Sequence, residues 1–253
     1  MRILLTFSLM CLLLLTACGG GSSGSAATGP SLAGNWQITL QNSASTNLKT
    51  ESGFFLQTGN SLNGNLLLNG SNTVCAGVGS VIGEVSGSNV AITVDQTGQT
   101  INLTGTAKSD SSMSGDYSIF SSPCGFTQVG TWTGTLVQPI TGTFQATFTS
   151  TKVGGVVFHF SGKVTQGQNT GASTASLSGS MSSTDSPCFT EATIAGLVSG
   201  TAIVFNLLSS EGVALAQYRG TASTDGKSIT GNYDIFTTPP GTCTDFGTAT
   251  VAF

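Results

Sequence analysis

The chain has 253 residues with 7 basic and 11 acidic side chains, and only 7% of its residues are charged. Soluble proteins carry roughly 25% charged residues on average, and proteins that bind nucleic acid gather Lys and Arg against the phosphates. No such cluster exists here, so we expect no nucleic-acid partner. The hydrophobic fraction of 38% lies in regular patterns, which excludes a disordered chain.

The first 18 residues have the form of an export signal. Arg2 supplies a positive end, and Ile3–Leu15 is an apolar core too short to span a bilayer. The following Leu15-Thr16-Ala17-Cys18 resembles the lipobox of bacterial lipoproteins. The resemblance implies that residues 1–17 are removed as a signal peptide and that Cys18 carries a membrane-anchoring lipid. Gly19 replaces the Asp that retains many such lipoproteins at the inner membrane, which implies the outer membrane.

The part of the chain that follows the signal is a short linker and two versions of one unit. Residues 18–30 are mostly Gly, Ser and Ala, which is typical of a flexible tether. The stretch Gly115–Cys124 returns as Gly231–Pro239, and Gly34–Leu40 is answered by Gly142–Phe148. Each unit of roughly 110 residues has the size of a small domain. The predicted domains are residues 31–138 and 139–253.

Both units alternate apolar and polar residues, which predicts strands with one buried face. Trp36, Ile38 and Leu40 alternate with polar neighbours, and we expect Val156, Phe158 and Phe160 to share one face. Turn signals separate the strands at Ser86-Gly87-Ser88, Thr97-Gly98-Gln99, Ser199-Gly200, Glu211-Gly212 and Asp225-Gly226.

The pattern predicts an all-β protein with about eight strands per unit and no helix after the signal. Such meanders form sandwiches or barrels, and a closed barrel leaves no exposed edge. We therefore expect two tandem antiparallel meander β-barrels. A transmembrane barrel fits less well because three Tyr and two Trp are few for its aromatic girdles. A β-solenoid would need a short uniform repeat, and none is visible.

Each unit opens with Gly-x-Trp or Gly-x-Phe on the first strand of its meander, which resembles the calycins (lipocalins and avidins). Lipocalins commonly set an Arg from a late strand against that Trp, whereas the last strand here, near 126–137, has none. The resemblance implies barrels that carry a small hydrophobic ligand. Four aromatic residues are candidates for facing a ligand or filling the core, and a core role is favoured: Trp36, Tyr117, Phe144 and Tyr233.

Cysteine usage agrees with export. Of six Cys, Cys11 leaves with the signal and Cys18 takes the lipid. The other four stand at matching positions in the two units, and exported chains meet an oxidising compartment. We predict the disulfides Cys75–Cys124 and Cys188–Cys243. A metal site is the alternative, but the sequence has no C-x-x-C pair and a single His, so we expect no metal and no cofactor.

Catalytic signals are weak. His159 lies between Phe158 and Phe160, so we expect an exposed strand histidine with no second catalytic group tied to it. Asp116 and Asp234 occupy different steps of the repeated strand and are expected to face solvent, and Arg219 is expected to be a lone exposed cation. A formal G-x-S-x-G match at 20–24 lies in the linker, where the strand-to-helix elbow it needs is absent.

These observations favour a non-enzymatic binding or interaction module of the cell envelope. Its Thr- and Ser-rich outer faces would contact another protein or a glycan, and duplication would double the binding face. Two alternatives stay open. The first is a carrier of a small hydrophobic ligand inside a calycin-like barrel, and the second is an enzyme of unknown type.

Overall fold

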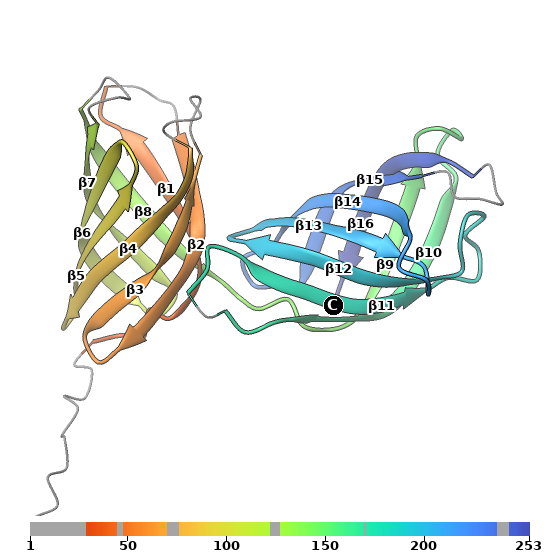
Figure 1. The fold of residues 1–253 in the computed structure, drawn as a ribbon, viewed down its shortest axis with the longest axis horizontal. Helices are drawn as coiled ribbons and strands as arrows, with labels where there is room; N and C mark the ends of the chain where they lie inside the picture. The colour runs from red at the N-terminus through yellow and green to blue at the C-terminus, as the bar shows by residue number, and fades with distance from the viewer. Residues whose placement is uncertain (1–28, 45–47, 70–75, 122–126, 170, 237–242) are drawn as a thin grey trace, which may run out of the picture.

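The computed structural model describes residues 29–44, 48–69, 76–121, 127–169, 171–236 and 243–253, which form two closed antiparallel barrels (Figure 1). Barrel 1 consists of β1 (Gly34–Asn42), β2 (Leu48–Thr58), β3 (Ser61–Leu68), β4 (Gly77–Ser86), β5 (Asn89–Gln96), β6 (Gln99–Ser109), β7 (Ser112–Ser121) and β8 (Gln128–Val137). Barrel 2 consists of β9 (Gly142–Ser150), β10 (Val157–Gln166), β11 (Ala175–Ser182), β12 (Glu191–Ser199), β13 (Ala202–Leu208), β14 (Ala214–Ala222), β15 (Ser228–Ile235) and β16 (Asp245–Ala252). Each strand pairs with the next, and the β1–β8 and β9–β16 pairs close the sheets. The predicted tandem eight-strand meander barrels are confirmed.

The period-2 pattern places the core inside each barrel. Trp36, Ile38 and Leu40 are all buried, and the predicted turns join neighbouring strands, with a positive φ of 71° at Gly226. One expectation was wrong: Val156 does not share the buried face of Phe158 and Phe160. It is 50% exposed because the chain is still in the β9–β10 turn there, and strand β10 begins one residue later.

The two barrels fill the same core space with different residues. At matching ladder positions, barrel 1 combines Leu103 with Trp132, whereas barrel 2 combines Tyr218 with Ala249. The large ring of barrel 1 is on β8, on one side of β7, whereas the large ring of barrel 2 is on β14, on the opposite side of the equivalent strand β15. The polar atom of each ring donates a hydrogen bond to a backbone carbonyl. Trp132 Nε1 donates to Thr104 O at 3.1 Å, and the Tyr218 hydroxyl donates to Ala249 O at 3.3 Å.

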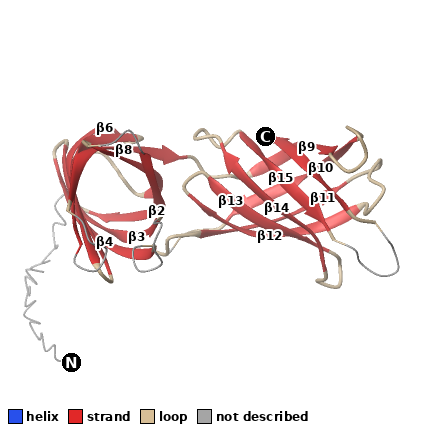
Figure 2. Cartoon of the chain, turned by 90° about the horizontal axis from the view of Figure 1, so that it is seen from above, coloured by secondary structure: helices blue, strands red, loops and turns tan. Residues whose placement is uncertain are grey.

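One end of barrel 2 abuts the wall of barrel 1, so that Figure 2 shows barrel 1 end-on and barrel 2 lengthwise. The β12–β13 turn reaches β1, where the Asn35 amide accepts a hydrogen bond from Gly200 N at 2.7 Å and donates one to Gly200 O at 2.8 Å. Phe54 of β2 is 3% exposed and packs into the core cluster of barrel 2. Strand β2 is therefore covered on both faces, and the whole run Glu51–Phe55 is buried.

Candidate functional site

The interior of barrel 2 is filled by side chains. Its internal void has a volume of about 20 Å³, close to the space of one water molecule. The walls of this void are apolar, and they are formed by Ile140, Phe144, Ala146, Phe148, Val164, Leu177, Met181, Ile194, Phe205, Ile229, Val251 and Phe253. Pockets that hold small ligands typically measure about 300–1,000 Å³. The interior of barrel 2 therefore has no room for such a ligand.

The structure places all four candidate aromatic residues in the barrel cores. Trp36 is fully buried, stacks on Phe55 with ring centroids 6.1 Å apart, and donates from Nε1 to Leu32 O at 2.8 Å. Phe144 packs edge-on against Phe253, with the ring centroids 6.0 Å apart. Tyr117 and Tyr233 are both buried at equivalent positions of β7 and β15.

Tyr233 belongs to a buried polar cluster at the end of barrel 2 that lies away from barrel 1. Its hydroxyl donates to Asp245 Oδ2 at 2.7 Å, and the Ser150 hydroxyl donates to Asp245 Oδ1 at 2.6 Å. Burial and the neighbouring Asp245 raise the pKa of Tyr233, so the phenol keeps its proton and acts as a donor. The rings of Phe148 and Phe158 pack around it. The carboxylate is held by two hydroxyl groups, which is a structural way to satisfy a buried acid.

We expect Tyr233→Phe to lower the unfolding free energy by about 2 kcal/mol, because Asp245 then stays buried with one donor fewer. Tyr117→Phe is the matched control, since no hydrogen bond to its hydroxyl occurs among the described residues. It should change stability by less than about 0.5 kcal/mol. Urea unfolding of both variants measures the difference, and equal losses would contradict a role of the Asp245 contact.

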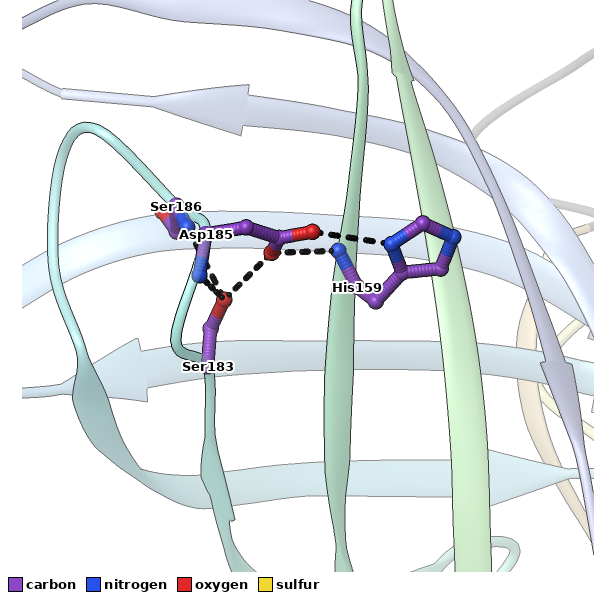
Figure 3. A network of polar contacts seen from close by, with 4 residues as sticks. All are labelled: His159, Ser183, Asp185 and Ser186. Atoms are coloured by element: carbon purple, nitrogen blue, oxygen red, sulfur yellow. Dashed lines mark hydrogen bonds and ion pairs between the residues drawn. The ribbon is translucent and has the colours of Figure 1, made fainter.

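His159 is exposed as predicted, but a second group is tied to it, which the sequence analysis did not foresee (Figure 3). Its backbone N–H donates to Asp185 Oδ1 at 2.8 Å, and its ring Nδ1 lies 2.8 Å from Asp185 Oδ2. These bonds hold the pKa of Asp185 down at about 2. The Ser183 hydroxyl donates to Asp185 at 2.9 Å rather than facing the imidazole. The three residues are therefore not arranged as a Ser-His-Asp triad, in which the hydroxyl must contact the imidazole.

This network fixes the loop that connects β11 to β12. Strand β11 pairs with β10 only as far as Ser161–Ser182. Beyond that point the Asp185 carboxylate accepts the hydrogen bond from the His159 N–H in place of a backbone carbonyl of β11. A disulfide between Cys188 and Cys243 ties the same loop to the segment before β16. The predicted Cys188–Cys243 pair is thus present. Cys75–Cys124 and the lipid site Cys18 lie outside the described residues.

Beside this loop, a hollow of about 600 Å³ opens at the end of barrel 2 that lies away from barrel 1; we call it the distal hollow. Its lining combines hydroxyl groups, one carboxylate and a few apolar groups, and consists of Ser161, Gly162, Ser180, Met181, Ser182, Phe189, Thr190, Glu191, Ala192, Thr193, Ser209, Ser210 and Leu215. The Phe189 ring packs against Phe160 at 5.3 Å and is only partly buried. Among the lining residues that the structure describes there is no Lys or Arg, so a negatively charged ligand would meet the Glu191 carboxylate without a cation to bind it.

A second hollow, of about 420 Å³, lies where the two barrels meet. Apolar side chains such as Leu56 and Leu136 alternate with amides in its lining. Several of these amides already serve the fold. Asn35 binds Gly200, and Gln166 Oε1 accepts the Ile140 N–H at 3.1 Å.

Glu51 is the buried acid of barrel 1, with 3% of its surface exposed. Burial raises its pKa to about 7, although a hydrogen bond from the Asn69 N–H and the charge of Lys49 act in the opposite direction. At neutral pH a large share of the molecules therefore carries a protonated Glu51. Such a shift is found at functional sites and at structural positions alike.

The remaining charged candidates face solvent. Asp116 and Asp234 are exposed, as expected. Arg219 is also exposed, but it is not isolated, because its Nε donates to Gln217 Oε1 at 2.8 Å. Among the described residues no group of three or more His, Cys, Asp or Glu side chains could hold a metal ion. No helix of the described ranges is long and apolar enough to cross a membrane.

Sequence reasoning missed Asp185, Asp245, Glu51 and the ring of Phe189. Asp185 and Phe189 lie in a loop whose sequence has no periodic pattern. The nearby Cys188 was the one residue there that the sequence singled out. Asp245 opens the last strand two residues after Cys243, and that position alone does not reveal that its side chain is buried.

Comparisons with known proteins add little. No family model and no curated protein matches the chain. Among solved structures, a crystal structure of kievitone hydratase from Nectria haematococca aligns over 92% of this chain and 92% of its own, at 8% sequence identity and a TM-score of 0.26. A likeness at that score supports neither a common fold nor a common activity. The description of the chain therefore rests on its own sequence and structure, which show two tandem antiparallel β-barrels with internal repeats and the disulfide Cys188–Cys243.

Proposed function

We propose that this chain is a non-catalytic binding module of the bacterial cell envelope, anchored by lipid at Cys18, most simply in the outer membrane. In this proposal the partner is recognised on the outer surfaces and ends of the barrels. The observation that carries it is the filled interior of barrel 2, whose void of about 20 Å³ leaves no room for a ligand inside that barrel. The distal hollow then offers a place for recognition that needs no empty barrel.

A carrier of a small hydrophobic ligand is the second candidate. It is favoured by the hollow between the barrels, since ligand sites often form where domains meet and since Phe54, Leu56 and Leu136 give it apolar walls. It is the weaker candidate because amide groups at the same place would lose water without gaining partners from an apolar ligand.

Native mass spectrometry of the chain extracted from bacterial membranes tests the proposal. The expected species lacks residues 1–17, carries a covalent acyl modification, and holds no hydrophobic small molecule that denaturation releases. A retained hydrophobic molecule would favour the carrier instead. An unmodified chain that keeps residues 1–17 would remove the lipid anchor from the proposal.

A further inference from the structure

We infer that the distal hollow binds a neutral oligosaccharide, with Phe189 as the apolar platform and Glu191, Ser182 and Thr193 as hydrogen-bonding groups. The inference rests on the proposed function and adds the ligand class. A volume of about 600 Å³ is in the usual range for a small-molecule site.

The chemistry of the lining selects the ligand. Hydroxyl groups both donate and accept, as the hydroxyl groups of a sugar do. The side chains of Ser182, Thr193 and Glu191 make no hydrogen bond within the part of the chain that the structure describes, so they are free to bind. A purely apolar ligand would dehydrate them without replacement bonds. An acidic ligand would meet the Glu191 carboxylate and no Lys or Arg among the described residues of the lining.

Phe189 adds the apolar element that a sugar ring requires. A pyranose presents C–H groups on one face, and packing that face on a ring removes apolar surface from water. Phe189 is held in place from several sides. The neighbouring Cys188 is in the disulfide, Thr190 O accepts the Ser183 N–H at 2.8 Å, and the ring lies on Phe160. A platform ordered before binding costs the complex less entropy.

The comparison with barrel 1 shows that the fold does not require Ser182, Glu191 or Phe189. The ladder pair Ser182–Glu191 of barrel 2 corresponds to Leu67–Val78 in barrel 1, because Ser182 and Leu67 each lie three residues after the equivalent glycines Gly179 and Gly64. By the same register Phe189 corresponds to Ala76. A barrel of the same topology therefore closes with an aliphatic pair and a methyl group at these positions. The polar pair and the ring of barrel 2 are therefore available for a ligand.

Isothermal titration of the full chain in detergent with cellohexaose, maltohexaose and chitohexaose tests this inference. We expect saturable binding of at least one of them. Phe189→Ala should weaken it by about tenfold or more, as expected for a central aromatic anchor. Because Phe189→Ala removes a core contact, the near-isosteric Glu191→Gln and Thr193→Val provide a second test, and each should weaken binding about threefold.

Two variants serve as matched controls. Phe246→Ala removes a 48% exposed ring outside the lining of the hollow, and Ser80→Ala changes the barrel 1 counterpart of Thr193. Both should bind like the unchanged chain. The inference is overturned if none of the three sugars titrates, if the hollow variants bind normally, or if spermine binds and the sugars do not. Cleavage of a bound sugar would support the site and overturn the non-catalytic function. If the chain binds none of the sugars and also retains no hydrophobic ligand, the inference fails while the proposed function stands.

Discussion

Replacing Cys188 and Cys243 together with serine should lower the unfolding free energy of barrel 2 by about 4 kcal/mol. The disulfide joins residues 55 positions apart, and a loop of that length loses roughly this much chain entropy when it is closed in the unfolded state. The bond also fixes the β11–β12 loop, so the same variant should loosen Phe189. Hydrogen exchange resolved by peptide measures both effects, because it reports each barrel separately.

Two comparisons make this result specific. Peptides of barrel 1 should keep their protection in the Cys188→Ser, Cys243→Ser variant. The corresponding Cys75→Ser, Cys124→Ser variant should show the reverse pattern if the second predicted disulfide forms. Uniform loss of protection over both barrels would instead mean that the barrels unfold as one unit. An unchanged barrel 2 would contradict a stabilising role of the disulfide.

The fold could be predicted from local patterns because each strand buries one face and each turn carries its own signal. Trp36, Ile38 and Leu40 mark an inward face by spacing alone, and glycines such as Gly226 mark turns because they adopt positive φ. The internal repeat then fixed the number of barrels. These features depend on residues close in sequence, which a single chain shows directly.

What the sequence could not show depends on contacts between distant segments. Phe54 stands on the outward face of β2 and would be expected in solvent, yet the end of barrel 2 covers it. Asp185 binds His159, which is 26 residues away in the sequence, and it lies in a loop that has no periodic pattern. The distal hollow is lined by residues of β10, β11, β12 and β14 and of two connecting loops, so its groups form no recognisable motif in the sequence. These residues come together only through the pairing register of the strands.

Glu51→Gln should raise the unfolding free energy of barrel 1 by about 3 kcal/mol at pH 8 and change it little at pH 4. Burial raises the pKa of Glu51 from 4.5 to about 7, so the folded state binds a proton more tightly than the unfolded state. Stability is therefore highest below pH 4.5, falls as the pH rises towards 7, and stays low above it. Each unit of pKa difference corresponds to about 1.4 kcal/mol. Glutamine keeps an acceptor for the Asn69 N–H and never becomes charged.

Tryptophan fluorescence is the suitable readout, because Trp36 and Trp132 are the only Trp residues of the chain and both lie in barrel 1. Urea unfolding at pH 4, 6 and 8 should show the unchanged protein losing stability over this window and the Glu51→Gln variant losing less. Glu84→Gln, at an exposed position of β4, should follow the unchanged protein. An equal effect of Glu51→Gln at pH 4 and pH 8 would mean that packing, rather than the buried charge, sets the stability at this position.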